Sequence, residues 1–241
     1  WVAKEFFAEK TLLEFFKLSQ SKMIPFKVEN QFAFSDKERN INVYIKREDL
    51  IHPFVSGNKF RKLKYNLAEA KKQNATILLT FGGAFSNHIA AVAAAGKLEG
   101  FKTIGIIRGD EVGEKINDNS TLKFASENGM QFEFVSREMY RNKTDEAFIL
   151  SLKHKYGDFY LIPEGGTNEL AVKGCSEILT EEDKSFNYIA CAVGTGGTIA
   201  GIIKSSLPNQ QVLGFPALKG DFLQNEIRNF VPELNWQLIN G

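Results

Sequence analysis

The stretch Ser56-Gly57-Asn58-Lys59-Phe60-Arg61-Lys62-Leu63-Lys64-Tyr65 passes from small, turn-forming residues into an amphipathic helix. Asn58 is the expected N-cap, because its side chain can accept a hydrogen bond from a backbone N–H of the first turn. Lys59 then lies on the first helical turn, where the positive end of the helix macrodipole opposes a charged amine. A lysine at this position does little for helix stability, so we ask what chemistry it could serve.

Three further cations follow within the next five residues: Arg61, Lys62 and Lys64. We expect these charges, together with partial burial, to disfavour the ammonium form of Lys59. A neutral amine at neutral pH is the nucleophile that Schiff-base chemistry requires. The alternative is a basic, solvated helix start without any chemistry, which is the ordinary interpretation of a lysine-rich helix.

The composition is that of an ordinary globular protein. The 241 residues are 43% hydrophobic and 24% charged, with a net charge of +1. This charge gives no support for nucleic-acid or membrane partners. Cys175 and Cys191 form no disulfide framework, which favours a reducing, cytoplasmic compartment. His52, His88 and His154 are too scattered to predict a metal site.

Strands and helices alternate along the chain and predict a mostly parallel α/β fold. Apolar strands are expected at 76–81, 103–107, 131–135, 159–162, 188–193 and 212–215, and a half-buried, alternating strand at 41–46. Helices are expected at 12–18, 59–72, 86–98, 121–128, 144–156, 170–179 and 199–205. Right-handed crossovers place the ends of parallel strands and the starts of helices at one edge of a sheet. We therefore expect the glycine-rich turns to meet at that edge, where open α/β folds bind ligands.

Gly194-Thr195-Gly196-Gly197-Thr198 follows a predicted strand and opens a predicted helix. Consecutive glycines let backbone N–H groups converge, and a helix N-terminus attracts anions. With two threonine hydroxyls as added donors, the motif predicts a phosphate-binding loop. It is neither a Walker loop nor a dinucleotide fingerprint, because no Gly-Lys-Ser/Thr follows and Ile199 stands where the third glycine belongs. The alternative is a plain tight turn.

Two more glycine turns precede this loop. Gly82-Gly83-Ala84-Phe85-Ser86-Asn87-His88 again joins a strand to a helix, and Ser86 could simply cap that helix. The two residues after Ser86 are expected to face the ligand edge. Glu164-Gly165-Gly166-Thr167-Asn168 can bring backbone amides up to a substrate carboxylate. Arg47-Glu48-Asp49, by contrast, is interpreted as a solvated charge cluster without chemistry.

In chain order, Ile45-Lys46-Arg47-Glu48-Asp49, Gly57-Asn58-Lys59-Phe60-Arg61-Lys62-Leu63, the 82–88 turn and the 194–198 loop resemble fold-type II pyridoxal-phosphate enzymes. From about Pro25 onward, the chain is similar to the branch of 1-aminocyclopropane-1-carboxylate (ACC) deaminase and D-cysteine desulfhydrase. The resemblance implies a two-domain, tryptophan synthase β-like α/β fold, with parallel sheets and helices on both faces. Its cofactor would be pyridoxal 5'-phosphate.

The resemblance also implies the domain boundaries. Residues 1–62 and 164–241 would form the large cofactor-binding domain, and residues 63–163 the small α/β domain. The chain ends at Gly241, whereas members of this family continue. We therefore expect a further C-terminal segment, which would carry the Tyr/Glu-type substrate residues and the partner of the pyridine nitrogen.

Each matching residue receives a role from the resemblance. Lys59 would form the Schiff base with the cofactor and move the substrate's proton. Asn87 would hydrogen-bond the phenolic oxygen of the cofactor, and Ser86 would engage the substrate, as a nucleophile in the deaminases. Lys62 and residues 194–198 would hold the phosphate. The expected substrate contacts are Asn58, Ser86, His88, Gly165 and Gly166.

The implied function is a deaminase or desulfhydrase that acts on a small amino acid as a cytoplasmic homodimer. D-cysteine would give pyruvate, sulfide and ammonia, and His88 in place of the glutamine common in the deaminases favours this substrate. The alternative substrate, ACC, would give 2-oxobutanoate and ammonia. Competing hypotheses are another fold-type II reaction, such as a dehydratase or sulfhydrylase, an inactive fragment, and a non-catalytic protein that binds a phosphorylated ligand. No metal, nucleic acid or membrane is expected.

Overall fold

The structure is a computed structural model that describes residues 26–217, 222–232 and 235–239. The helix expected at 12–18 lies outside these residues. The larger sheet has four parallel strands in the spatial order β5 (Met130–Val135), β4 (Lys102–Arg108), β3 (Ile77–Gly83) and β6 (Tyr160–Ile162). The smaller sheet has three parallel strands, in the order β7 (Tyr188–Val193), β8 (Gln211–Pro216) and β9 (Trp236–Leu238). The expected mostly parallel α/β fold is therefore confirmed, and β9 is a strand that the sequence pattern missed.

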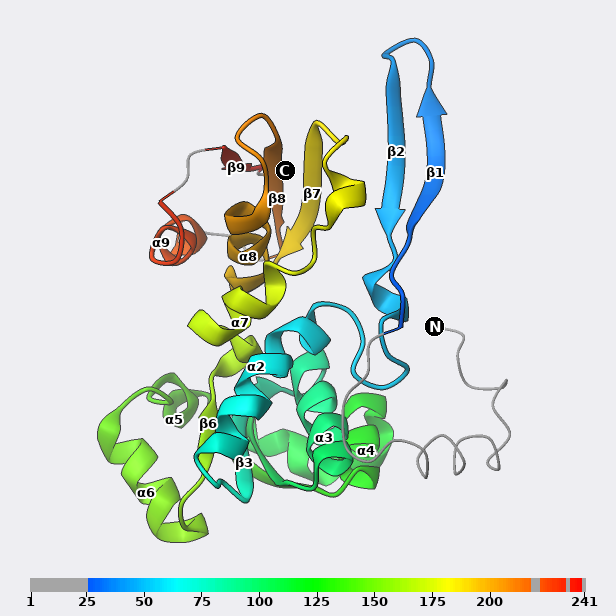
Figure 1. Ribbon diagram of the computed structural model, residues 1–241. Coiled ribbons are helices and arrows are strands. Elements are labelled where there is room, and N and C mark those ends of the chain that lie inside the picture. Colours follow the sequence, from blue (N-terminus) through cyan, green and yellow to red (C-terminus); the bar gives the residue numbers. More distant parts are fainter. Residues whose placement is uncertain (1–25, 218–221, 233–234, 240–241) are drawn as a thin grey trace.

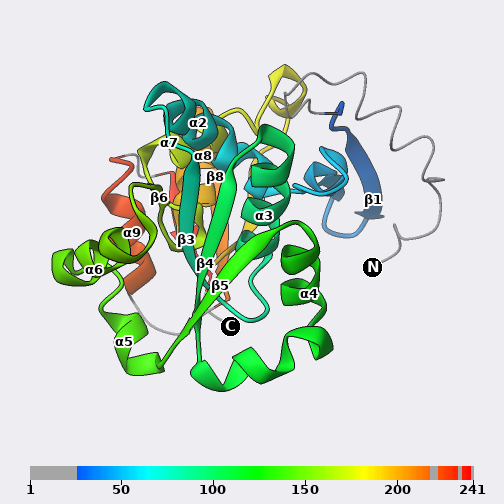
Figure 2. The same cartoon turned by 90° about the horizontal axis from the view of Figure 1, so that it is seen from below.

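Helices cover both faces of the larger sheet (Figure 2). One face packs against α3 (Asn87–Glu99) and α4 (Ser120–Glu127), and the other against α5 (Arg137–Arg141) and α6 (Glu146–Tyr156). Successive strand residues point to opposite faces, so Leu78 joins the first core while Leu79 and Phe81 join the second. Helix α3 approaches the sheet closely at a glycine, because a Cβ at Gly96 would lie 2.2 Å from Cγ2 of Thr103.

Three helices connect the two sheets (Figure 1): α2 (Asn58–Lys72), α7 (Glu169–Cys175) and α8 (Gly197–Ser205). They touch through glycines. A Cβ at Gly174 of α7 would lie 1.9 Å from the backbone oxygen of Arg61 in α2, and a Cβ at Gly201 of α8 would lie 2.4 Å from Cβ of Cys175. Only glycine permits backbones this close. Helix α9 (Phe222–Arg228) contributes Leu223 and Ile227 to the core of the smaller sheet.

The N-terminal strands form a hairpin apart from both sheets (Figure 1). In this hairpin β1 (Asn30–Asp36) pairs antiparallel with β2 (Ile41–Lys46). The prediction that β2 is half-buried is wrong, because Ile41, Tyr44 and Ile45 are 46%, 43% and 53% exposed. A two-stranded ribbon has no second layer to cover it, so alternating apolar residues stay partly in solvent.

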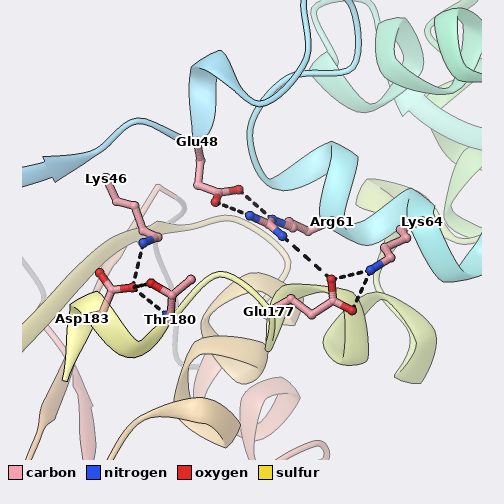
Figure 3. Close-up of polar contacts among 7 residues, drawn as sticks. All are labelled: Lys46, Glu48, Arg61, Lys64, Glu177, Thr180 and Asp183. Carbon is pink, nitrogen blue, oxygen red and sulfur yellow. Dashed lines mark hydrogen bonds and ion pairs between the residues drawn. The ribbon is translucent and has the colours of Figure 1, made fainter. Parts of the chain in front are cut away.

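Charged pairs join the hairpin and α2 to residues 177–183, which follow α7, and join α2 to the segment after the hairpin (Figure 3). Lys46 of β2 lies 2.7 Å from Asp183, whose carboxylate also accepts hydrogen bonds from Asn30 and from the backbone and hydroxyl of Thr180. Glu48 lies 2.8 Å from Arg61, with both side chains largely buried. The interpretation of residues 47–49 as a solvated cluster is therefore wrong for Glu48.

Short 3-10 helices complete the fold at Glu48–Leu50, Asp110–Asp118, Glu164–Gly166 and Glu181–Asp183. The expected helix at 170–179 is shorter than predicted and ends at Cys175, where α7 stops. In the part of the chain that the structure describes, no helix has the length and apolar character needed to cross a membrane.

The first prediction concerns the contact between α2 and α7. Gly174→Ala places a methyl group against the backbone of Arg61, so we expect the free energy of unfolding to fall by about 1–3 kcal/mol. Gly194→Ala serves as the control for stability, because a Cβ at Gly194 meets no atom within 4 Å. Urea denaturation followed by circular dichroism measures both variants, and an unchanged midpoint for Gly174→Ala would contradict the close packing.

The second prediction concerns Asp183. Burial raises the pKa of this carboxyl, but Lys46, Thr180 and Asn30 outweigh it and leave the pKa below its ordinary value of 3.8. Stability from the ionised carboxylate is present above pH 3.8 and is lost as the pH falls through the folded-state pKa.

Lys46→Met should therefore lower the free energy of unfolding at pH 7 by about 2 kcal/mol and flatten its decline in acid. The matched control is Lys184→Met, which removes an exposed pair with Glu181 and should cost less than about 0.5 kcal/mol. Equal losses in the two variants, measured by urea titrations between pH 2 and 7, would count against a special role for Asp183.

Candidate active site

Turns that are distant in sequence meet at two lysine amines. The amine of Lys62 donates to the carbonyl oxygen of Gly165 at 2.9 Å, to Oγ1 of Thr167 at 2.9 Å and to Oγ1 of Thr195 at 3.3 Å. Lys59 donates to the same Gly165 oxygen at 3.2 Å. The 164–168 and 194–198 turns therefore meet, as expected, although they follow strands of two different sheets rather than sharing the edge of one.

The start of α2 differs from the sequence expectation. Asn58 is the first helical residue, and the N-cap is Gly57, whose φ of 61° suits glycine. The prediction of Asn58 as the N-cap is therefore wrong. Its amide instead donates to Oγ1 of Thr198 at 2.7 Å, which joins the start of α2 to the 194–198 loop.

Within the described part of the chain, the two amines have no negative partner. Every oxygen that accepts from them is a neutral carbonyl or hydroxyl. Burial lowers the pKa of Lys59 to about 8, with Cys175 acting weakly in the opposite direction. Burial also lowers the pKa of Lys62, and the charge of Lys59 adds to this effect, which brings the value to about 7. Near pH 8, Lys62 is therefore mainly neutral, and Lys59 is about equally divided between its neutral and charged forms.

Burial, rather than the neighbouring cations, depresses the pKa of Lys59. Arg61 pairs with Glu48, and Lys64 pairs with Glu177 at 2.6 Å, so their charges are compensated outside the site (Figure 3). The expectation that Arg61 and Lys64 act on Lys59 is wrong. Helical geometry explains it, because residues two and five positions away project from other sides of the helix.

The 194–198 loop is shaped around the amine of Lys62. Gly196 adopts a left-handed conformation with φ of 79°, and α8 begins at Gly197. A Cβ at Gly197 would lie 3.0 Å from Oγ1 of Thr167 and 3.3 Å from Nζ of Lys62. The first N–H groups of α8 have no partner within the helix, so the loop presents donors beside two amines and two hydroxyls.

The 82–88 turn forms a third side of the site around the two lysines. Ser86 caps α3 by accepting a hydrogen bond from the backbone N–H of Ile89 at 3.4 Å, and Asn87 is exposed on the first turn. His88 is buried, and its ring lies against Gly166, where a Cβ would be 3.0 Å from Cε1. The structure therefore brings His88 into contact with the 164–168 turn.

Sequence reasoning missed Thr167 and Cys175. Thr167 holds Lys62, and the signal for it was a hydroxyl directly after two glycines at a strand end. The charges of both lysines act on the Cys175 thiol. Burial raises its pKa to about 11, and Lys62 and Thr198 partly offset this effect. No sequence signal marks this cysteine, because only the packing of α7 on α8 brings it near the site.

A family model described as pyridoxal-phosphate dependent enzyme matches residues 30–217. The chain belongs to the pyridoxal-phosphate-dependent enzyme family. It is 42% identical over 170 residues to a putative ACC deaminase of Thermotoga maritima, covering 67% of this chain and 53% of that protein. It is 34% identical over 175 residues to a mitochondrial bifunctional D-cysteine desulfhydrase/ACC deaminase of Arabidopsis thaliana, covering 66% and 44%. The chain thus spans about half the length of these relatives.

A crystal structure of an ACC deaminase homologue superimposes with a TM-score of 0.75 at 25% identity, covering 97% of this chain and 77% of that one. Members of the family depend on pyridoxal phosphate, and the residues of this chain fit that group. Its phosphate carries two negative charges, and the site offers two uncompensated amines, two hydroxyls and a helix N-terminus. Its aldehyde needs a lysine of lowered pKa, which Lys59 provides.

The third prediction follows from the lowered pKa of Lys62. A phosphate dianion beside this amine favours the ammonium form, so the pKa rises on binding. At pH 8 the binding of inorganic phosphate should therefore take up about one proton per site. Isothermal titration calorimetry in buffers of different ionisation enthalpy measures this number.

Lys62→Met is the control for this measurement. Without the amine, phosphate should bind more weakly and with little proton uptake. Release of protons by the wild-type protein, or the same uptake in both proteins, would show that Lys62 does not hold the anion.

Proposed function

We propose that this chain binds pyridoxal 5'-phosphate through Lys59, Lys62 and residues 194–198, and removes the amino group from a small amino acid. The observation that carries this proposal is the pair of amines at Gly165, which face the glycine loop and have no carboxylate partner within hydrogen-bond range among the residues that the structure describes. The names of the relatives, ACC deaminase and D-cysteine desulfhydrase, support the reaction class.

The proposed substrate is D-cysteine, which reacts with one water to give pyruvate, hydrogen sulfide and ammonia. Pyridoxal phosphate supplies, when bound, an aldehyde that condenses with amines and a ring that spreads the negative charge of the substrate's Cα. Lys59 takes the proton from Cα at Nζ, because its lowered pKa leaves the amine partly neutral near pH 8. Sulfide leaves from Cβ.

The other residues bind and orient the cofactor and the substrate. Lys62, Thr195 and Thr198 hold the phosphate, and Asn87 binds the phenolic oxygen of the cofactor. The carbonyl oxygen of Gly165 positions both amines through its two hydrogen bonds. The proposed substrate contacts are Asn58, Ser86, His88, Gly165 and Gly166, and Ser86 is the candidate nucleophile.

ACC is the second candidate substrate. The 42% identical Thermotoga relative is named for ACC deaminase, and the Arabidopsis relative is named for both activities. Water and ACC give 2-oxobutanoate and ammonia. In this reaction a cyclopropane bond opens instead of a Cβ–S bond, so the two candidates differ in the group next to Cα and in the keto acid produced.

The remaining expectations belong to the same proposal. Residues 1–62 and 164–241 form the large domain and residues 63–163 the small one, in line with the division of the parallel strands into two sheets. The protein acts as a homodimer in the cytoplasm. The unpaired thiols of Cys175 and Cys191 favour a reducing compartment.

The fourth prediction tests the reaction. Purified protein carrying its cofactor is assayed with D-cysteine, L-cysteine and ACC, and release of keto acid is followed. We expect the largest kcat/KM with D-cysteine, and a loss of at least about 1,000-fold in Lys59→Ala, because no other group replaces the lost base. The visible absorbance of the bound cofactor should shift in the same variant.

Lys153→Ala is the matched control, since this lysine lies on the exposed side of α6. It should retain full activity. A colourless wild-type protein that ignores added cofactor would contradict the proposal. Retained binding of a phosphorylated ligand in Lys59→Ala, with no turnover by wild-type protein, would favour the non-catalytic alternative.

A further inference from the structure

Thr80 and His88 form a buried pair beside the site. Thr80 lies on β3 and is 0% exposed, and His88 lies in the first turn of α3 and is 1% exposed. Oγ1 of Thr80 lies 2.8 Å from Nε2 of His88 and 2.8 Å from the carbonyl oxygen of Ile162. One hydroxyl therefore joins β3, α3 and β6 where these elements approach the lysine amines.

These two contacts determine which nitrogen of His88 carries the ring proton. A hydroxyl has one hydrogen to donate, and the carbonyl of Ile162 can only accept. The Thr80 hydroxyl therefore donates to Ile162 and accepts from His88. The ring proton is on Nε2, which leaves Nδ1 as an unprotonated acceptor.

Nδ1 of His88 is buried and has no hydrogen-bond partner among the residues that the structure describes. It lies on the side of Gly166, where a Cβ would be 3.3 Å from Nδ1 and 3.6 Å from Cδ of Lys62. Burial, and then the charges of Lys59 and Lys62, lower the pKa of His88 well below its ordinary value, with a smaller opposing effect from the Pro163 carbonyl. The ring stays neutral, so Nδ1 offers a lone pair and no proton. A buried acceptor without a donor is rare in proteins and calls for an explanation.

Lys59 has donors to spare, and it bonds Gly165, the residue before the Gly166 against which the His88 ring lies. A lysine ammonium has three N–H donors, and the described acceptor for Lys59 is the Gly165 oxygen alone, at 3.2 Å. The amine of Lys62 already has three acceptors. Of the two charges, that of Lys59 acts more strongly on His88.

We propose that Thr80 is a positioning residue that locks His88 as the Nε2–H tautomer, so that Nδ1 accepts a hydrogen bond from Lys59 whenever its amine is protonated. Rotation of the Lys59 side chain away from Gly165 makes this contact. The proton stays on Nζ of Lys59 and no bond to it breaks. The inference rests on the proposed role of Lys59, since Nδ1 stabilises the amine after it has taken the substrate's proton.

The tautomer is measured without substrate or cofactor, from long-range 1H–15N correlation spectra of protein labelled with 15N-histidine. The chain has three histidines, and His88→Gln assigns the signal of interest. We expect Nε2 protonated and Nδ1 unprotonated in the wild type and in Thr80→Ser, which keeps the hydroxyl. Thr80→Val should give a mixture of tautomers. Thr103→Val, which removes another buried threonine hydroxyl from β4, should leave the spectrum unchanged.

A protonated Nδ1 in the wild type, or an unchanged tautomer in Thr80→Val, overturns the role of Thr80. Because neither observation depends on turnover, this failure is distinct from failure of the proposed reaction, which is the absence of keto acid from wild-type protein.

The contact with Lys59 is tested through the pKa of its amine, followed by NMR of 13Cε-labelled lysine and assigned with Lys59→Ala. Loss of an acceptor for the charged form lowers a pKa, so His88→Leu should lower that of Lys59 by about one unit. His88→Gln retains an acceptor and should stay within a few tenths of the wild type. Thr80→Val repeats the test with the histidine present and should shift the pKa in the same direction. An unchanged pKa in His88→Leu and Thr80→Val overturns the contact.

Discussion

One carbonyl oxygen, that of Gly165, receives hydrogen bonds from both Lys59 and Lys62, and no carboxylate of the described residues pairs with either amine. Burial disfavours the ammonium form of both amines, and the charge of Lys59 further disfavours that of Lys62. The pKa of Lys59 is thereby lowered to about 8 and that of Lys62 to about 7. In the proposed function, a bound phosphate would pair with Lys62, and Lys59 would remain the nucleophile. The proposed roles thus assign anion binding to one amine and the reaction to the other.

Close packing of three helices maintains this geometry. Gly174 lets α7 approach the backbone of α2, and Gly201 lets α8 approach α7. The lysines of α2 are in this way fixed against the loop that opens α8, although 135 positions separate Lys59 from Gly194. The pairs of Arg61 with Glu48 and with Glu177 lie on the outer side of α2 and keep other cations out of the site (Figure 3).

The sequence predicted the parallel α/β fold and the meeting of the glycine turns, because hydrophobic periodicity and turn residues are local signals. It did not predict that Glu48 pairs with Arg61 or that Thr80 binds His88, since such contacts depend on how distant elements pack. Asn58 illustrates the limit. Its side chain suits a helix cap, yet it donates to Thr198 because the 194–198 loop lies within reach. The β1–β2 hairpin shows the same limit for burial, because alternation alone does not supply a covering layer.

The central claim is that Lys59, and not Lys62, bonds to the cofactor's aldehyde. Reduction of the cofactor-loaded protein with borohydride, followed by proteolysis and mass spectrometry, measures this directly. The account predicts a pyridoxyl group on the peptide at Lys59 and an unmodified Lys62. Modification of Lys62, or of a lysine distant from Gly165, would contradict it.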